Sequence, residues 1–471
     1  MAYQFLTFSN LKAYRLYSIY YLLVFSLFFR FFPGFGVRCL SILVTSQALI
    51  LFEHTRLLID LSLFRNVAVI GAGMTRFHHK IHGEKQSREM FVEAALEAAN
   101  SVDNGFRLNE SEALYLGYFS SDIFEKQGHT SALMADALGI NPVPATRVEA
   151  ACASSGAAVN IGIFAIASGL YDVVLVGGVE KMRTLGTGAV TDALAMASDV
   201  SYEAAVGFTF PGLYAAITAA HFKRYGSKWE QLADIAIKNH DNGKLNPKAQ
   251  YQETILEIAN KIGQRKGIEF NDPMEFLTSD LNPMVAEPLR LFDCCPISDG
   301  AAVAILASDE VARKYTDTPV YVAGLGHASD TMALHDRAEL TSLNATKVAS
   351  RQAYKMVGIE PKDISLACVH DCFTGAEMVA TEDLGFFEPG TGGKAASEGR
   401  TALSGDIPIN TDGGLKAKGH PVGATGAGMV VEIFKQMRGE AGDRQVSDPM
   451  YGMAHNVGAT GGTVTVQVYR R

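Results

Sequence analysis

The chain contains few cysteines for its length, and it has no long run of basic residues. Its six cysteines stand at positions 39, 152, 294, 295, 368 and 372 of 471 residues, without the spacing of a zinc site. This usage predicts a reducing, cytoplasmic location, no disulfide framework and no bound metal. The net charge is −9 at pH 7, and aromatic residues do not interleave with basic ones, so we expect no nucleic-acid partner.

The first 64 residues lack an apolar run as long as the roughly 18 residues of a clean membrane span. Tyr17–Phe29 is uncharged and apolar, Arg30 interrupts it, and Cys39–Phe52 is a second uncharged run. We interpret residues 1–64 as an apolar extension translated from a misplaced start, because a globular domain begins afresh at Arg65. A signal-like segment, or membrane attachment through this extension, is the alternative that we do not favour.

From Arg65 onward, short β-rich runs alternate with helical patterns. With 48% hydrophobic residues, the chain can bury a large core in two or three domains. The alternation predicts a layered α/β fold. Strands are expected at 67–73, 112–119 and 173–178, and helices at 87–102, 130–140 and directly after Cys152.

The same order of elements begins again near Pro319. Its glycine-rich strand VYVAGLGHASD echoes VAVIGAGMTRF, and a helix, a strand and two further helices follow. We therefore predict two similar halves, residues 65–315 and 316–471, each contributing one glycine-rich helix start to a shared site. The segment from about 181 to 288 has no counterpart in the second half, so we expect it to form an inserted lobe.

Cys152 is the candidate nucleophile. It lies in RVEAACASSGAAV, where an extended segment meets a helix amid residues too small to cover a thiol. The unpaired N–H groups and positive dipole end of that helix are expected to favour the thiolate and lower the pKa of the thiol. On its own, this cysteine would more often be a buried, inert packing residue, and the rest of the chain reverses that interpretation.

The second half supplies partners for this thiol. His420 opens the helix that corresponds to the one after Cys152, so the two helix starts could face each other. An imidazole there can accept the thiol proton or donate to a developing oxyanion. His370 and Cys372 lie in VHDCF at the end of a predicted strand, where catalytic residues of sheets emerge. We interpret Cys294 and Cys295 as packing residues.

Several motifs, in their order and spacing, resemble those of the thiolase family over residues 65–471. They are VEAACASSGAAV (148–159), GGVEKM (177–182), SDGAAVAIL (298–306), NTDGGLKAKGHPVGATGAGM (410–429) and HNVGATGG (455–462). The resemblance implies a five-layered αβαβα fold of two βαβαβαββ halves, and acyl-CoA chemistry through an acyl-cysteine. It implies Cys152 as nucleophile, His420 as its activator, and Lys416, Lys418 and Gly419 beside the CoA pocket. Coenzyme A is then a substrate, and no cofactor is expected.

Two departures from the family pattern are informative. Many thiolases carry NEAF where this chain has HDCF, and a catalytic cysteine in a CxGGG turn where this chain has Asn456 to Thr460. This combination resembles the sterol-carrier-protein type and the archaeal acetoacetyl-CoA thiolases, which implies Cys372 as the acid/base and His370 in place of the asparagine that holds an oxyanion-hole water. The turn at Asn456 and Gly458 would face the substrate, with the Gly458 N–H as an oxyanion donor.

The resemblance implies a reversible acyltransferase that converts two acetyl-CoA into acetoacetyl-CoA and CoA, or cleaves longer 3-oxoacyl-CoA. Such a reaction belongs to lipid metabolism and to the mevalonate route to isoprenoid precursors. A homodimer or homotetramer is expected, with hydroxymethylglutaryl-CoA synthase and a small scaffold protein as partners. Two alternatives stay open at this point: a non-catalytic thiolase-like protein that binds acyl-CoA, and a decarboxylating ketosynthase.

Overall fold

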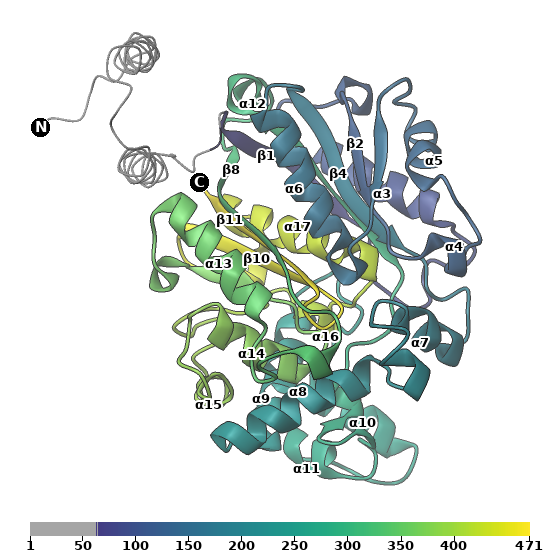
Figure 1. Ribbon diagram of the computed structural model, residues 1–471, viewed down its shortest axis with the longest axis vertical. Coiled ribbons are helices and arrows are strands. Elements are labelled where there is room, and N and C mark those ends of the chain that lie inside the picture. The colour runs from purple at the N-terminus through teal and green to yellow at the C-terminus, as the bar shows by residue number, and fades with distance from the viewer. Residues whose placement is uncertain (1–62, 64) are drawn as a thin grey trace, which may run out of the picture. The chain divides into compact units, whose positions relative to one another are not determined.

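A sheet of nine strands is the framework of the computed structural model, which describes Leu63 and residues 65–471 (Figure 1). Our interpretation of residues 1–64 therefore lies outside the described residues, apart from Leu63. The strands follow the order β3-β2-β4-β7-β1-β8-β11-β10-β9. Their bounds are β1 Val67–Met74, β2 Leu114–Gly117, β3 Ala145–Val148, β4 Val173–Glu180, β7 Gly300–Ser308, β8 Val320–Ser329, β9 Leu366–Cys368, β10 Tyr451–Gly458 and β11 Thr463–Arg470.

The sheet repeats one pairing pattern twice. In the first copy, β2 runs parallel to β3 and β4, and β7 lies antiparallel between β4 and β1. In the second copy, β9 runs parallel to β10 and, through an isolated bridge, to Ile409, while β11 lies antiparallel between β10 and β8. Strands β1 and β8 join the copies. The predicted fold of two similar α/β halves is confirmed, and the exact domain limits stay predictions.

Two central helices separate the two copies of the sheet. Helix α6 (Ser154–Ala167) packs on β2 and β4 and also contacts β11, whereas α17 (Thr425–Arg438) packs on β10 and also on β7 and β1. On the outer faces, α3 (Ser87–Asn100) covers β1 and β7, and α13 (Asn344–Val357) covers β8 and β11 (Figure 1). These are the five layers that the resemblance to the thiolase family implied.

Glycines set the distance between the central helices. A Cβ atom on Gly426 would lie 2.4 Å from the backbone nitrogen of Gly156 and 2.4 Å from Oδ1 of Asn456. Atoms do not approach that closely, so only glycine permits this contact. The hydroxyl of Ser155 accepts a hydrogen bond from the N–H of Ala427 at 3.0 Å beside it. The expectation that the two glycine-rich helix starts face each other is confirmed.

The insertion, which follows β4 and precedes β7 along the chain, forms a helical lobe (Figure 1). It packs against the second half, where α8 and α9 contact α14 (Thr374–Asp383), and α9 also contacts α16 (Gly414–Ala417). The lobe has an apolar core of its own around Phe276 and Ile255. Its elements are α7 Thr187–Ala195, α8 Phe210–Tyr225, α9 Trp229–Lys244, α10 Ile255–Gln264, α11 Pro273–Thr278, β5 Met284–Ala286 and β6 Leu289–Arg290. None of the helices in residues 65–471 has the length and apolar character that a membrane crossing requires.

We predict that Gly426→Ala lowers the free energy of unfolding by about 1–3 kcal/mol, because the added methyl group must push the helix starts apart. The midpoint of urea unfolding measures this loss. Gly188→Ala, at an exposed position of α7 where a Cβ meets no atom within 4 Å, is the matched control and should be neutral or slightly stabilising. Equal midpoints for the two variants would contradict the close approach.

Candidate active site

Cys152 occupies a single 3-10 turn, Ala151–Ala153, between β3 and α6. Ala151 has φ +50, a left-handed conformation that costs free energy in a residue other than glycine. Side chains hold this turn: Glu149 accepts the N–H of Ala151 at 2.7 Å, and the Ser154 hydroxyl accepts the N–H of Ala150 at 3.0 Å. The nucleophile candidate therefore sits at the predicted junction on a constrained backbone.

Three predicted site residues converge. The sulfur of Cys152 and one ring nitrogen each of His370 and His420 all lie within 4.8 Å of one another. The two imidazole rings meet edge to face, with centroids 5.1 Å apart and an interplanar angle of 82°. Cys152 comes from the first half of the chain and both histidines come from the second, so the site exists only when the halves are packed together.

The tautomer of His420 follows from its hydrogen bonds. Its Nδ1 lies 2.7 Å from the hydroxyl of Thr425, and that hydroxyl donates its hydrogen to the carbonyl of Pro421 at 3.0 Å. A hydroxyl has one hydrogen, so the Thr425 oxygen must accept from Nδ1–H. The other ring nitrogen, Nε2, then carries a lone pair. His420 is in this way arranged as a proton acceptor.

His370 has the opposite arrangement, and Asn456 sets it. The amide nitrogen of Asn456 donates to the carbonyl of Cys152 at 3.0 Å and lies 3.2 Å from Nδ1 of His370. A carbonyl only accepts, so the amide nitrogen must face it, and Nδ1 of His370 must be the acceptor of the second bond. Nε2 of His370 is then protonated. It is buried and has no hydrogen-bond partner among the described residues, so it is available as a donor to a substrate oxygen.

The cluster of Cys152, His370 and His420 is close enough to consider as a metal site. A metal ion requires a lone pair on each ligating nitrogen. His370 presents an N–H at its free nitrogen, because Asn456 occupies the other one. The hydrogen bonds therefore favour proton transfer over metal binding.

Burial decides the charge state of the nucleophile. Burial raises the pKa of the Cys152 thiol to about 12. The backbone N–H of Ala459 acts in the opposite direction and lowers this pKa, but by less. Burial and the charge of Lys418 lower the pKa of His420 to about 3. Our expectation of a lowered thiol pKa was wrong, because desolvation outweighs the nearby backbone N–H groups that favour the thiolate. The resting pair is therefore a neutral thiol and a neutral imidazole.

Cys372 is buried at the end of β9, beside the same cluster. The N–H of Cys295 donates a hydrogen bond to the carbonyl of Cys372 at 3.0 Å. Cys294 pairs with Phe373 in an isolated antiparallel β-bridge of the backbone. Burial and then the neighbouring thiols of Cys295 and Cys152 raise the pKa of Cys372 well above its usual value. Cys294 and Cys295 pack against the hydrophobic core, which is compatible with our interpretation of both as packing residues.

The residues expected beside the CoA pocket lie inside the protein. Lys418 forms a buried ion pair with Asp412, and the Lys416 ammonium lies 5.5 Å from the centre of the Phe292 ring. Gly419 has φ +115 in the turn before His420, a conformation that favours glycine. Their observed contacts build the loop that presents His420, and contact with CoA stays a prediction.

Glu180 joins the two halves at the site, and we did not single it out from the sequence. Its buried carboxylate accepts the N–H groups of Phe119 and Ser120 at 3.1 Å each and of Gly423 at 2.9 Å. Gly423 belongs to the loop between His420 and α17. The motif GGVEKM is the signal that could have indicated this role, since a carboxylate that ends a buried strand needs donors.

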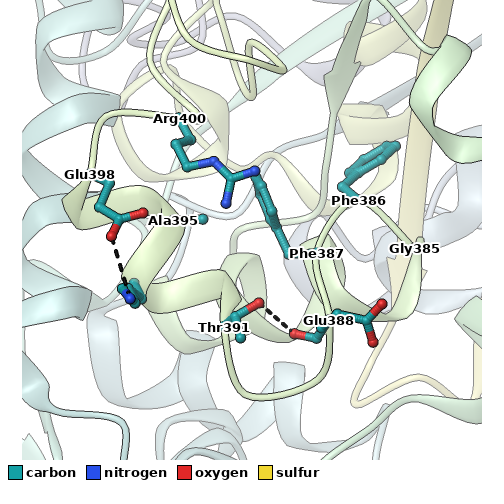
Figure 2. Close-up of a pocket in the computed structure, with 9 residues that line it drawn as sticks. Gly385, Phe386, Phe387, Glu388, Thr391, Ala395, Glu398 and Arg400 are labelled. Carbon is teal, nitrogen blue, oxygen red and sulfur yellow. Dashed lines mark hydrogen bonds and ion pairs between the residues drawn. The ribbon is translucent and has the colours of Figure 1, made fainter.

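A pocket of about 660 Å³ borders the nucleophile turn. Its lining includes Ala150 and Ala151 on one side and Gly458 and Ala459 on the other. The pocket in Figure 2, about 330 Å³ in volume, lies around α15 (Gly392–Ser397) and contains none of the predicted site residues. There the guanidinium of Arg400 lies 4.8 Å from the centre of the Phe387 ring (Figure 2). We place substrate access at the pocket of about 660 Å³, because this pocket reaches the turn that carries Cys152.

Comparison with known proteins shows which families and solved structures this chain resembles. The description "Thiolase, N-terminal domain" matches residues 67–310, and "Thiolase C-terminal domain-like" matches residues 326–471. The acetyl-CoA acetyltransferase of Methanothermobacter thermautotrophicus is 46% identical over 409 residues, which are 86% of this chain and 100% of that protein. Sterol carrier protein 2 of Oryctolagus cuniculus is 30% identical over 83% of this chain and 69% of that protein. The solved structure of an Ltp2-ChsH2(DUF35) aldolase has a TM-score of 0.71 and 21% identity, over 85% of this chain and 97% of that one.

We predict that Glu180→Gln lowers the free energy of unfolding by about 1–3 kcal/mol, because an NH2 group replaces an oxygen that accepts N–H donors. The difference in the free energy of unfolding between the wild type and Glu180→Gln should depend on pH. Burial raises the pKa of Glu180 to about 8, whereas an unfolded glutamate titrates near about 4.3. The folded state binds the extra proton between these values, so the wild type should lose stability relative to the variant as the pH rises through this window.

Urea unfolding of both proteins at pH 5, 7 and 9 measures this difference. A wild type that gains stability over Glu180→Gln between pH 5 and 9 would contradict the raised pKa. The matched control is Glu440→Gln, a surface carboxylate bound to Arg438, whose effect should be small at every pH.

Proposed function

The chain belongs to the thiolase family, and we propose that it catalyses the reversible condensation of two acetyl-CoA molecules to acetoacetyl-CoA and CoA through an acylated Cys152. One observation carries this proposal. The thiol of Cys152 lies within 4.8 Å of the two histidines, one arranged to accept a proton and the other to donate one. That pairing of a nucleophile, a base and an acid suits acyl transfer. The archaeal acetyl-CoA acetyltransferase, at 46% identity, supports the acetyl group as the unit transferred.

The first half reaction loads the enzyme. The sulfur of Cys152 attacks the thioester carbon of acetyl-CoA while Nε2 of His420 takes the thiol proton. The negative oxygen of the tetrahedral intermediate is stabilised by backbone N–H groups, for which those of Cys152 and Gly458 are our candidates. The C–S bond to CoA then breaks, and His420 returns the proton to the departing CoA sulfur. Acetyl-Cys152 and free CoA result.

The second half reaction forms the carbon–carbon bond. Cys372 passes its thiol proton to Nε2 of His420, and the resulting thiolate removes a proton from the methyl group of a second acetyl-CoA. The enolate oxygen receives a hydrogen bond from the Nε2–H of His370, directly or through a water, and this donor faces no other acceptor among the described residues. The carbanion attacks the acetyl carbon on Cys152, the bond from that carbon to the Cys152 sulfur breaks, and His420 gives its proton to the Cys152 sulfur. In reverse, the same steps cleave a 3-oxoacyl-CoA.

The surroundings of the reaction are proposals of the same kind. Acyl-CoA and CoA are the expected small-molecule partners of a thiolase. The solved aldolase of similar fold is named as a complex with a DUF35 protein, which supports a small scaffold protein as a partner here. We propose, further, a cytoplasmic homodimer or homotetramer that serves the mevalonate route together with hydroxymethylglutaryl-CoA synthase.

Intact mass measurement of the full chain after exposure to acetoacetyl-CoA tests the mechanism. We expect an acetyl adduct on the wild type that free CoA discharges. Cys152→Ala should form no adduct. Cys372→Ala should keep the adduct formed from acetyl-CoA but lose about 10²- to 10⁴-fold in the rate of acetoacetyl-CoA synthesis, because its acid/base is missing.

Cys368→Ala is the matched control, because Cys368 is a buried thiol of β9 that makes no contact with the cluster in the described hydrogen bonds. It should behave as the wild type does. Absence of an adduct on the wild type would contradict the proposed function and favour non-catalytic acyl-CoA binding. Condensation that requires malonyl-CoA in place of acetyl-CoA would indicate a decarboxylating ketosynthase instead.

A further inference from the structure

The side chains of Tyr214 and Asn239 reach the HDCF segment (residues 370–373) from the inserted lobe. Tyr214 of α8 packs its ring on that of Phe373, with centroids 4.9 Å apart, and its hydroxyl donates to the carbonyl of Ala459 at 2.9 Å. Asn239 of α9 is fully buried and makes polar contacts instead. We did not single out Asn239 from the sequence, because its partners lie 132 and 138 residues away.

Asn239 bridges two buried carboxylates. Its amide nitrogen donates to Asp371 at 2.9 Å and to Glu377 at 2.8 Å, so both amide hydrogens are used. Glu377 is also paired with Lys238 at 2.6 Å, whereas among residues 65–471 no ion pair reaches Asp371 and Asn239 is its one side-chain donor. Burial, and then the negative charge of Glu377, raise the pKa of Asp371, so its ionised form depends on such donors.

The Asp371 carboxylate joins the HDCF segment to the loop that leads to His420. It accepts the backbone N–H groups of Leu415 at 2.7 Å and of Lys416 at 3.1 Å. A Cβ atom on Gly414 would collide with this carboxylate, so only glycine permits the close contact. An Asp371 that moves therefore displaces the segment that carries two of the catalytic groups.

Glu377, the other end of the bridge, holds the residue before His370. It accepts a hydrogen bond from the side-chain amide of Asn410 at 2.9 Å. The Asn410 carbonyl oxygen in turn accepts the backbone N–H of Val369 at 2.8 Å. Both chain neighbours of His370 are thus connected, directly or through one further amide, to the two carboxylates that Asn239 bridges.

We propose that Asn239 is a positioning residue of the second half reaction: its amide bridges Asp371 and Glu377 and thereby orients His370 and Cys372 toward the second acetyl-CoA. This inference rests on the proposed function, because it requires these two groups to act in carbon–carbon bond formation. Asn239 itself touches no reacting atom and transfers no proton.

The first half reaction should depend less on this amide. Cys152 and His420 carry it out, and other side chains hold them: Glu149 accepts the N–H of Ala151 in the nucleophile turn, and Thr425 bonds Nδ1 of His420. Loss of the Asn239 amide should therefore separate the two half reactions.

The test compares both half reactions in Asn239→Ala, on the full chain. Exchange of deuterium from heavy water into the methyl group of acetyl-CoA reports proton removal by Cys372, and intact mass reports acetylation of Cys152. We expect exchange to slow by about 10- to 100-fold, because a misplaced base and donor lose their orientation, and acetylation to change less than about threefold.

Asn239→Asp distinguishes hydrogen bonding from the filling of space. Aspartate keeps the shape of asparagine but has no N–H to donate when ionised, so exchange at pH 8 should slow at least as much as in Asn239→Ala. Exchange at the wild-type rate in Asn239→Asp would overturn the inference. Thermal unfolding of each variant verifies that the fold is retained, and Asn239→Ala decides if Asn239→Asp does not fold.

Asn260→Ala is the matched control, because Asn260 of α10 also makes two hydrogen bonds but keeps them within the lobe. Its amide donates to the carbonyl of Phe270 at 3.1 Å and accepts the N–H of Phe270 at 3.0 Å. The control should lower the midpoint of thermal unfolding and leave the ratio of exchange to acetylation unchanged.

The outcomes separate this inference from the proposed function. If Cys372→Ala abolishes exchange while Asn239→Ala exchanges at the wild-type rate, the role of Asn239 is wrong and the proposed function stands. If Asn239→Ala slows exchange and acetylation equally, or Asn260→Ala slows exchange as much, the amide acts only on the stability of the lobe, which also overturns the inference. If Cys372→Ala retains exchange, the acid/base assignment itself fails.

Discussion

The contact between Gly156 and Gly426 determines whether the two halves of the chain can share one site. Cys152 precedes the first central helix and His420 precedes the second, so the distance between the helix starts sets the distance between thiol and imidazole. A side chain on Gly426 would displace Asn456 as well as Gly156. Asn456 in turn bonds both Cys152 and His370. The spacing of the packed helices is therefore also the spacing of the chemical groups.

The same close packing removes water from the site, and this makes hydrogen bonds the means by which the protein assigns roles. Both histidines are buried, and burial lowers the pKa of each. Neutral imidazoles differ only in which nitrogen carries the hydrogen. Thr425 places the hydrogen of His420 on Nδ1, and Asn456 leaves that of His370 on Nε2. Two identical side chains thereby present different groups, a lone pair on His420 and an N–H on His370.

The alternation of strands and helices, the duplication, and the convergence of Cys152 with His420 could be predicted from the sequence. Each depends on local patterns: apolar periodicity, repeated order, and glycine at helix starts. The direction in which folding shifts the pKa of Cys152 could not be predicted, because this direction depends on how completely the folded chain excludes water from the thiol. The contacts of Tyr214 and Glu180 could not be predicted for a related reason. Their partners, Ala459 and Gly423, lie 245 and 243 residues away in the sequence.

The HDCF motif shows how one strand end serves both chemistry and architecture. His370 and Cys372 lie with the nucleophile, while Asp371 and Phe373 bind the surrounding layers. The Asp371 carboxylate accepts a hydrogen bond from the side chain of Asn239 of α9 at 2.9 Å. It also accepts the N–H of Leu415 at 2.7 Å, in the short helix α16 that precedes His420. Phe373 packs on Tyr214 of α8. Because Asn239 and Tyr214 both belong to the inserted lobe, the insertion fixes the segment after β9 that carries His370 and Cys372.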